Sequence, residues 1–286
     1  MDIGQTLIDT EATVRFAAFA VVFALMAAWE VVAPRRELSL PKSRRWLANL
    51  GVTLLNVTLV RVLFPTATVG IALAAAERQW GLFNALAVPL PLAFVVSFLV
   101  LDLVIWIQHV AFHRVPLLAR LHRMHHIDLD IDVTTGLRFH PVEILASLLI
   151  KFAAVIALGA PAAAVLAFEL ALTLGSLFNH GNVRMPGALD RALRLLVVTP
   201  DMHRVHHSIL SEEINSNFGF FLSWWDRLFG TYRAAPQAGH DGITIGVRDT
   251  RDPSVCARLG PMLALPFQER ADDFPCARQG LEVNRS

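Results

Sequence analysis

Histidine is the residue whose spacing in this sequence points most directly to chemistry. Eight of the 11 histidines fall into three groups, which are His109 and His113, then His122, His125 and His126, and finally His203, His206 and His207. Spacings of three and four residues place side chains on one face of a helix. Neutral imidazole is the commonest nitrogen ligand for transition metals. The three groups therefore predict a metal site.

Two single histidines lie between these groups and are further candidate ligands. His140 stands in Arg138-Phe-His-Pro-Val-Glu143, and His180 stands in Asn179-His-Gly-Asn182. His140 could instead cap a helix or support a ligand. Ten imidazoles exceed what one ion can hold, so two ions with four or five nitrogens each fit the count. His240, in the C-terminal tail, is expected to be an ordinary polar residue.

The residues themselves leave the metal open, because imidazole suits Zn, Cu, Fe and Ni alike. The sequence lacks the Glu-x-x-His pairs of carboxylate-bridged di-iron bundles. It also lacks the His-Glu-x-x-His motif of zinc hydrolases. A haem needs one histidine on each of two helices, so this density of histidine would be wasted on it.

Four polar residues near the histidines could orient the imidazole rings from behind. They are Asp102, Glu143, Asp201 and Asn182. Asp102 lies seven residues before His109, on the same helical face, where a charge in a membrane is costly and suggests a role. It could alternatively pair with Arg61. For Glu143 and Asp201, capping of a helix end and plain solvation are equally open.

The composition places this chemistry in a membrane. Apolar residues make up 55% of the 286 residues and charged residues 17%, whereas a soluble domain carries about 25% charge. The formal net charge of +1 gives no reason to expect a nucleic acid partner. The two cysteines, Cys256 and Cys276, form no metal-ligand pattern.

Several apolar stretches reach the roughly 20 residues that a membrane helix needs. They are 16–33, 47–76 with interruptions at Arg61 and Pro65, 82–107, and a hairpin made of 142–158 and 162–178. We predict an all-α polytopic membrane protein with about four transmembrane helices or helix pairs and a cytoplasmic histidine-rich cap for two metals. The expected regions are an N-terminal transmembrane region 1–108, a catalytic region 109–232 containing the hairpin 142–178, and a cytoplasmic tail 233–286.

The distribution of Lys and Arg predicts the orientation, since these residues concentrate in cytoplasmic loops. Residues 1–14 contain neither, the loop 34–45 contains five, the loop around Arg78 one, and the interval 112–141 four. The N-terminus is therefore expected outside, and all three histidine groups on the cytoplasmic side. The excess of Arg over Lys is typical of a bacterial coding sequence, so we expect an inner-membrane protein.

The histidine groups and their neighbours resemble the fatty acid hydroxylase / sterol desaturase superfamily of membrane di-iron enzymes. The resemblance covers nearly half of the chain. It rests on these segments in order: His109-Val-Ala-Phe-His113, Leu121-His-Arg-Met-His-His126, Leu137-Arg-Phe-His-Pro-Val-Glu143, Phe178-Asn-His-Gly-Asn182, Val198-Thr-Pro-Asp-Met-His-Arg-Val-His-His207 and Trp225-Asp-Arg-Leu-Phe-Gly-Thr-Tyr232.

This resemblance implies two iron ions held by the eight grouped histidines and His180, with zinc possible in the purified protein. It also implies that O2 is activated to oxidise an unactivated C–H bond of a lipid that enters from the bilayer. No fused haem or ferredoxin domain is recognisable, so a separate electron donor is expected, of the ferredoxin or cytochrome b5 type with its reductase. Phe112, Phe139, Phe178 and Trp106 could line the substrate path.

The leading interpretation is a lipid hydroxylase, and a lipid or sterol desaturase with the same centre is the alternative. Two interpretations from other classes remain. A zinc-dependent membrane hydrolase would use Glu143 as its base, although it would not need so many imidazoles. A non-catalytic metal-binding or transport protein would spread its histidines through the bilayer, whereas here they cluster on one side.

Overall fold

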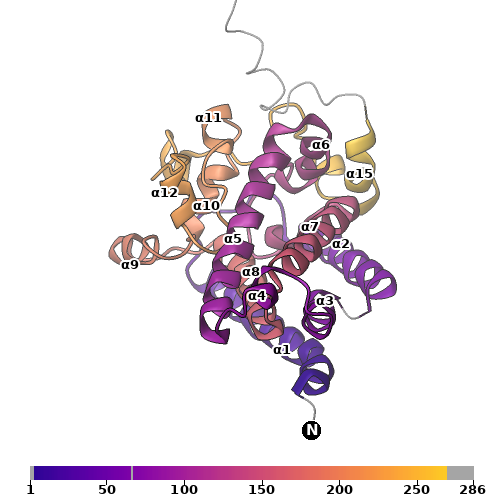
Figure 1. Cartoon of the computed structure of the whole chain (residues 1–286). Coiled ribbons are helices and arrows are strands. Elements are labelled where there is room, and N and C mark those ends of the chain that lie inside the picture. Colours follow the sequence, from indigo (N-terminus) through magenta and orange to yellow (C-terminus); the bar gives the residue numbers. More distant parts are fainter. Residues whose placement is uncertain (1–2, 66, 269–286) are drawn as a thin grey trace, which may run out of the picture.

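The computed structural model describes residues 3–65 and 67–268. All regular secondary structure in these ranges is helical. Only isolated β-bridges occur within those ranges, and no strand does. Figure 1 shows the arrangement of the longer helices, which are α1 (Ile3–Val32), α2 (Lys42–Leu63), α3 (Ala67–Glu77), α5 (Leu90–Arg114), α6 (Pro116–His126), α7 (Pro141–Leu158) and α8 (Ala162–Asn179). The predicted all-α class is confirmed.

Shorter helices fill the remainder. They are α4 (Leu82–Ala85), α9 (Gly187–Leu193), α10 (Pro200–His206), α11 (Ser211–Ile214), α12 (Trp224–Leu228), α13 (Gly239–Gly242), α14 (Pro253–Cys256) and α15 (Leu259–Ala264), with 3-10 turns at Thr135–Leu137 and Leu265–Phe267. In Figure 1, α6, α11 and α15 lie at the end of the molecule opposite the start of α1. Cys256 is a buried free thiol, and Cys276 lies outside the described residues.

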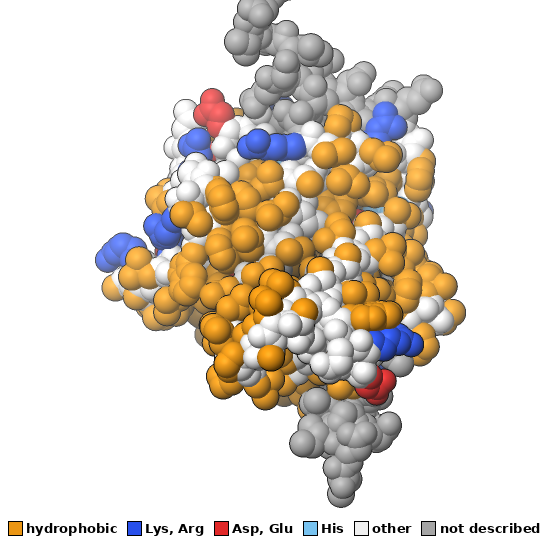
Figure 2. Space-filling model, viewed as in Figure 1, with side chains coloured by type: hydrophobic (Ala, Val, Ile, Leu, Met, Phe, Trp, Pro, Cys, Tyr) orange, Lys and Arg blue, Asp and Glu red, His pale blue; other side chains and the backbone are white. Residues whose placement is uncertain are grey.

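Five stretches are long and apolar enough to cross a membrane. They are Thr10–Val32, Lys42–Ala85, Leu90–Arg114, Pro141–Leu158 and Ala162–Asn179. Their outward faces are apolar: Phe16 is 72% exposed, Leu47 81% and Leu92 54%. Exposed apolar surface on this scale marks contact with lipid rather than water. Hydrophobic side chains also cover most of the face seen in Figure 2. The chain is a polytopic membrane protein, as its composition predicts.

Two of the expected apolar stretches are interrupted where prolines fall. The stretch 47–76 divides into α2 and α3 near Pro65, and the stretch 82–107 begins with the separate short helix α4. Helix α5 then starts directly after Pro89. Proline lacks an N–H donor and fits the first turn of a helix but not its interior. Helix α5 continues unbroken to Arg114, so one rigid element carries both His109 and His113.

The predicted helical hairpin of α7 and α8 is confirmed, and its turn depends on Gly159. This residue has φ of 67°, a left-handed conformation that glycine adopts without cost. A Cβ atom there would lie 2.7 Å from the carbonyl oxygen of Trp80, so the turn also packs closely on the segment before α4. Helix α8 packs against α1, α3 and α5, and this central position places its C-terminal end at the histidine groups.

A buried ion-pair network fastens α2 to the loop that follows α6. Arg45 is fully buried and donates to both oxygens of Asp128 at 2.8 Å and to Asp132 at 2.5 Å. Burial alone would raise the pKa of Asp128, but Arg45 and Arg138 outweigh it and lower the pKa to about 2. The loop that follows the second histidine group is therefore held against α2 by buried paired charges.

We expect Arg45→Met to destabilise the protein by about 3–5 kcal/mol, because it leaves buried Asp132 without its ion-pair partner and Asp128 with only Arg138, 3.6 Å away. Thermal unfolding of the detergent-solubilised protein, followed by circular dichroism, measures the effect. Arg44→Met is the matched control, since Arg44 is the exposed neighbour on the same helix. Equal midpoints for Arg45→Met and the wild type would show that the network does not hold the loop.

Candidate metal centre

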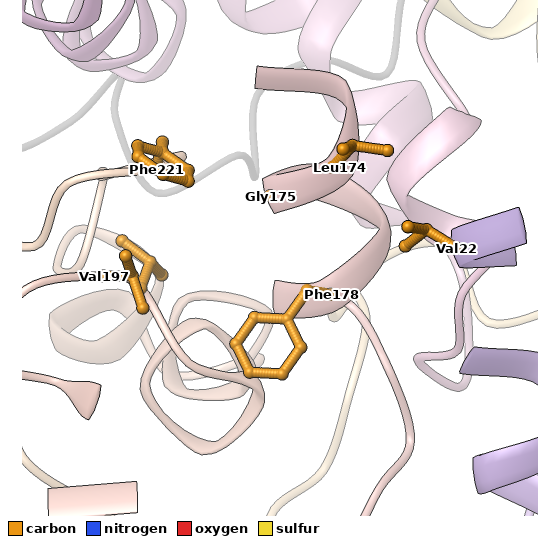
Figure 3. Close-up of a pocket in the computed structure, with 7 residues that line it drawn as sticks. Val22, Leu174, Gly175, Phe178, Val197 and Phe221 are labelled. Atoms are coloured by element: carbon orange, nitrogen blue, oxygen red, sulfur yellow. The ribbon is translucent and has the colours of Figure 1, made fainter. Parts of the chain in front are cut away.

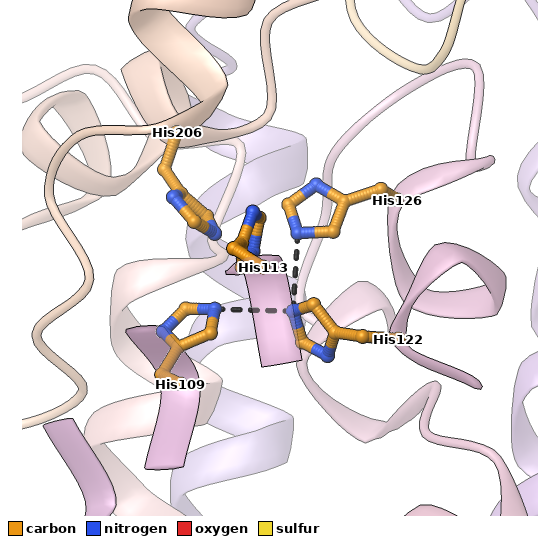
Figure 4. Close-up of side chains that lie close together, drawn as sticks. All are labelled: His109, His113, His122, His126 and His206. Carbon is orange, nitrogen blue, oxygen red and sulfur yellow. Dashed lines mark hydrogen bonds between the residues drawn. The ribbon is translucent and has the colours of Figure 1, made fainter. Parts of the chain in front are cut away.

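Nine of the ten candidate histidines converge into two buried groups. The five-histidine group consists of His109, His113, His122, His126 and His206, and the four-histidine group of His125, His180, His203 and His207. In each group, one ring nitrogen of every member lies within 4.8 Å of those of the others. Figure 4 shows the rings of the five-histidine group turned toward a common centre. Either group could hold a metal ion.

Two short helices contribute to both groups. Helix α6 gives His122 and His126 to the five-histidine group and His125 to the other. Helix α10 places His206 in the five-histidine group, whereas His203 and the capping residue His207 belong to the other. The ring centroids of His126 and His207 are 4.6 Å apart. The two candidate sites therefore share a wall and lie side by side.

Hydrogen bonding fixes the tautomers of one facing pair in the five-histidine group. His109 donates from Nδ1 to the carbonyl oxygen of Phe218 at 2.7 Å, and the Nδ1 of His122 lies 2.6 Å from the Glu143 carboxylate. A carbonyl and a carboxylate only accept, so both ring protons sit on Nδ1. The two Nε2 lone pairs then face each other at 3.1 Å. A cation between them would turn this repulsion into coordination.

The same pattern recurs in the four-histidine group. His180 donates from Nδ1 to the carbonyl oxygen of Ser176 at 2.8 Å, and His125 to that of Arg138 at 3.3 Å. Their Nε2 atoms are 3.2 Å apart. Two nitrogens bound to one metal at the usual bond length, with tetrahedral or right angles, are separated by about 3.0–3.4 Å. Both groups match that separation.

Other inward nitrogens are also available for a metal. His206 donates from Nδ1 to the carbonyl oxygen of Ser216 at 2.7 Å, which leaves its buried Nε2 without a hydrogen-bond partner within residues 3–65 and 67–268. Both ring nitrogens of His207 are buried and unpartnered in the same ranges. Buried nitrogens without partners are costly and need an explanation. A bound metal ion in each group provides one.

Burial keeps these imidazoles neutral. Loss of hydration, reinforced by neighbouring histidines, lowers the pKa values of His125, His126, His203 and His207 well below 6.5. Burial likewise lowers the pKa of His206 to about 3 and that of His180 to about 4. A metal binds only the neutral ring. The lone pairs are therefore available throughout the neutral range without the release of a proton.

His140 belongs to neither group. Its Nδ1 accepts the backbone N–H of Val142 at 3.2 Å, and its Nε2 lies 3.2 Å from the carbonyl oxygen of Leu263. It is the residue that caps the N-terminus of α7. The structure therefore gives His140 the capping role that its sequence context left open, and nine candidate ligands remain. His240 lies apart from both groups, 3.8 Å from Asp201.

Of the four polar residues expected to orient the rings, only Glu143 contacts a histidine of either group. Asp102 accepts from the indole N–H of Trp225 at 2.7 Å and from the backbone N–H of Leu222 at 3.3 Å. It pairs with neither a histidine nor Arg61, and instead fastens α5 to α12 and to Leu222 just before that helix.

Asp201 and Asn182 stabilise the chain around the histidine groups. Asp201 pairs with Arg204 and lies 3.4 Å from Arg35. The amide of Asn182 donates to the carbonyl oxygen of Arg36 at 2.8 Å. Both residues therefore hold the loop after α1 against the histidine-bearing end, and the structure gives them this role in place of the expected contact with an imidazole.

The segment 216–219 is a functional element that the sequence reasoning missed. Its carbonyl groups at Ser216 and Phe218 accept from His206 and His109, two histidines on different helices. The aromatic content of 215–226 dominates its sequence pattern and is typical of a segment at the membrane interface. Asn217 and Asp226, two polar residues within the aromatic stretch 215–226, are the signal that could have revealed the role of the segment 216–219.

Asp226 fixes this segment in place. Its buried carboxylate accepts the backbone N–H groups of Phe218 and Gly219 at 2.8 and 2.9 Å. It also accepts from the indole N–H of Trp106 at 3.0 Å and the hydroxyl of Thr231 at 2.7 Å. The carboxylate therefore sets the position of the carbonyl that orients His109, without touching a ring itself.

Aromatic side chains pack closely on the histidines. Phe139 stacks flat on His125, with ring centroids 4.4 Å apart. The ring centroids of Phe112 and His122 are 5.9 Å apart. Trp106 stacks on Phe229. These three expected path-lining residues therefore serve as packing around the site, whereas Phe178 lines an apolar pocket.

The sequence model of the fatty acid hydroxylase family matches residues 94–231, the stretch that contains all nine converging histidines. This match, which covers just under half of the chain, supports membership of the fatty acid hydroxylase superfamily. The resemblance drawn from the histidine motifs is confirmed. No solved structure is significantly similar to this chain.

Two curated relatives are similar to this chain over about half of its length. An ornithine lipid hydroxylase of Rhizobium tropici is 32% identical over 158 residues, which are 54% of this chain and 46% of the relative. The alkylglycerol monooxygenase of Homo sapiens is 30% identical over 141 residues, which are 49% of this chain and 30% of the relative. The matched region thus spans less than half the length of either relative.

We expect Glu143→Gln to weaken metal binding, because the amide keeps the shape of the carboxylate but removes the charge behind His122. Loss of such a supporting contact typically lowers metal affinity 10–100-fold, roughly. Competition with a chelator of known affinity measures the change. Glu212→Gln serves as the control, since its side chain is 80% exposed. Unchanged affinity in Glu143→Gln would remove Glu143 from the metal centre.

Proposed function

We propose that this protein is a membrane di-iron oxygenase that hydroxylates a C–H bond of a lipid. The observation that carries the proposal is the pair of adjacent nitrogen-only groups in which imidazole lone pairs face each other at 3.1 and 3.2 Å. We assign the nine converging histidines as the ligands of two iron ions. When bound, the two ions would supply the electron-transfer chemistry that allows O2 to be reduced at the site.

The reaction proposed is R–H + O2 + 2e− + 2H+ → R–OH + H2O. One oxygen atom enters the lipid, and the other leaves as water. The two electrons come from a separate donor of the ferredoxin or cytochrome b5 type with its reductase. The protein keeps the reacting region dry, since all nine histidines are buried. Excluding water protects a reactive centre from side reactions.

The names of the relatives support a lipid substrate. One is called an ornithine lipid hydroxylase and the other an alkylglycerol monooxygenase. Both names specify a lipid or an alkylated glycerol and the insertion of oxygen. We therefore assign an alkyl or acyl chain of a membrane lipid as the substrate class, and hydroxylation as the outcome in preference to desaturation.

The position of Glu143 argues against the hydrolase alternative. A zinc hydrolase needs a carboxylate beside the metal-bound water. Glu143 instead contacts His122 through Nδ1, the ring nitrogen that points away from the group. It is placed to orient a ligand and not to activate water. The clustering of all nine histidines at one end of the helices likewise disfavours transport across the membrane.

We further propose that the histidine-bearing end faces the cytoplasm of a bacterial inner membrane. The structure brings the basic loop 34–45 to that end, because Arg45 pairs with Asp128 and Arg35 lies 3.4 Å from Asp201. Reporter fusions ending at residues 45 and 78 test this orientation. We expect a cytoplasmic signal at 45 and a periplasmic one at 78, and the reverse pattern would overturn it.

The reaction is tested by incubating the reconstituted protein with labelled O2, a reductase system and a total lipid extract. We expect one labelled oxygen atom in a lipid hydroxyl group, detected by mass spectrometry, and a complete dependence on O2 and reductant. A new double bond without label would identify a desaturase. Equal turnover in the absence of oxygen would contradict both and favour a hydrolase.

A further inference from the structure

An apolar pocket of about 260 Å³ lies beside the candidate metal centre. It opens between α1, α8 and the segments around Val197 and Phe221, as Figure 3 shows. Helix α1 contributes Val22, and Phe178 points in from the end of α8. The side chains that line it are all hydrocarbon, and Gly175 adds only backbone.

The absence of a side chain at Gly175 determines how closely the far wall approaches α8. A Cβ atom there would lie 3.0 Å from the Phe221 ring and 3.3 Å from the Phe220 carbonyl oxygen. Two hydrogen bonds hold this wall. The amide of Asn179 donates to the Phe220 carbonyl oxygen at 2.7 Å, and the backbone N–H of Val198 donates to that of Phe221 at 2.8 Å. The pocket is thus bounded by fixed backbone.

The same wall contacts the two histidine groups. The ring of Phe220, the residue before the pocket-lining Phe221, lies 4.9 Å from His109 and 6.2 Å from His203, one member of each group. On the opposite side, Phe178 is only two residues before His180. The wall of the pocket is therefore continuous in sequence with residues that pack on the two histidine groups.

Two of the helices that border the pocket are candidate membrane spans. Val22 belongs to the candidate span Thr10–Val32, and Gly175 and Phe178 to the span Ala162–Asn179. Residues next to the lining residues are exposed and apolar: Val21 is 58% exposed and Leu196 is 57% exposed. A hydrocarbon lining beside membrane-spanning helices would admit a hydrocarbon chain more readily than water or a polar head group.

We propose that this pocket binds the alkyl chain of the lipid substrate, which enters sideways from the bilayer between α1 and the segment around Val197. The assignment of the occupant rests on the proposed function, whereas the pocket itself does not. A hydrocarbon chain fits because the lining offers no side-chain donor or acceptor. Its head group would stay outside the pocket, so the lining selects for the chain and not for the head group.

A photoreactive lipid tests occupancy independently of catalysis. The full-length protein is reconstituted in lipid nanodiscs that contain a glycerolipid with a diazirine on its acyl chain, irradiated, and mapped by mass spectrometry. We expect labelling concentrated on peptides that contain Val22, Phe178 and Val197. Val197→Trp should fill the pocket and reduce this labelling several-fold, whereas the exposed neighbour Leu196→Trp should leave it unchanged. Uniform labelling of all outward helix faces, unaffected by Val197→Trp, would overturn the proposal.

A second pair of variants links the pocket to turnover. Val22→Trp should keep the metal content of the wild type and lose most lipid oxidation, while the adjacent Val21→Trp keeps both. Full activity in Val22→Trp and Val197→Trp would contradict a role for the pocket. The two proposals fail separately: pocket labelling without any oxygen incorporated into lipid by the wild type would refute the oxygenase alone. Oxygen incorporation without pocket labelling would refute the pocket alone.

Discussion

The structure depends on one electrostatic constraint, which is that imidazole lone pairs converge in a space without water. His109 and His122 direct their unprotonated nitrogens at each other, as do His125 and His180. Such pairs repel unless a cation lies between them, and burial removes the protonated ring as an alternative. The acceptors behind the rings enforce this arrangement, because each holds a proton on the outward nitrogen. The protein therefore carries the repulsion that a metal relieves.

The membrane helices provide the rigidity that this constraint requires. Helix α5 runs continuously from its lipid-facing part to His109 and His113, and α8 runs to the end at which His180 stands. The short helices α6 and α10 then need to be held only at their ends, and the Arg45 network and the segment 216–219 do this. A site built on elements anchored in the bilayer lies within reach of lipid chains while its polar atoms stay out of the hydrocarbon.

The candidate ligands could be found from the sequence because helical spacing is a local property. Sequence reasoning could also find the membrane spans, since apolar length is local, and Glu143, which lies within a histidine motif. It could not divide the histidines between two groups, because that depends on how α6 and α10 face each other. Asp226 was hidden for another reason: its nearby partners Phe218, Gly219 and Thr231 follow no regular spacing, and its fourth partner, Trp106, lies 120 residues away in the sequence. His140 shows the reverse case, where a motif-like context serves to cap a helix.

The most direct test of the central claim is a metal count on the full-length protein reconstituted anaerobically with ferrous iron. We expect two iron ions per chain, with nitrogen ligands in the iron-edge absorption spectrum. His207→Ala removes a member of the four-histidine group only, so this variant should lose one of the two iron ions. His240→Ala should keep both ions. A wild type that binds one ion or none, or a His207→Ala variant with full metal content, would contradict the central claim.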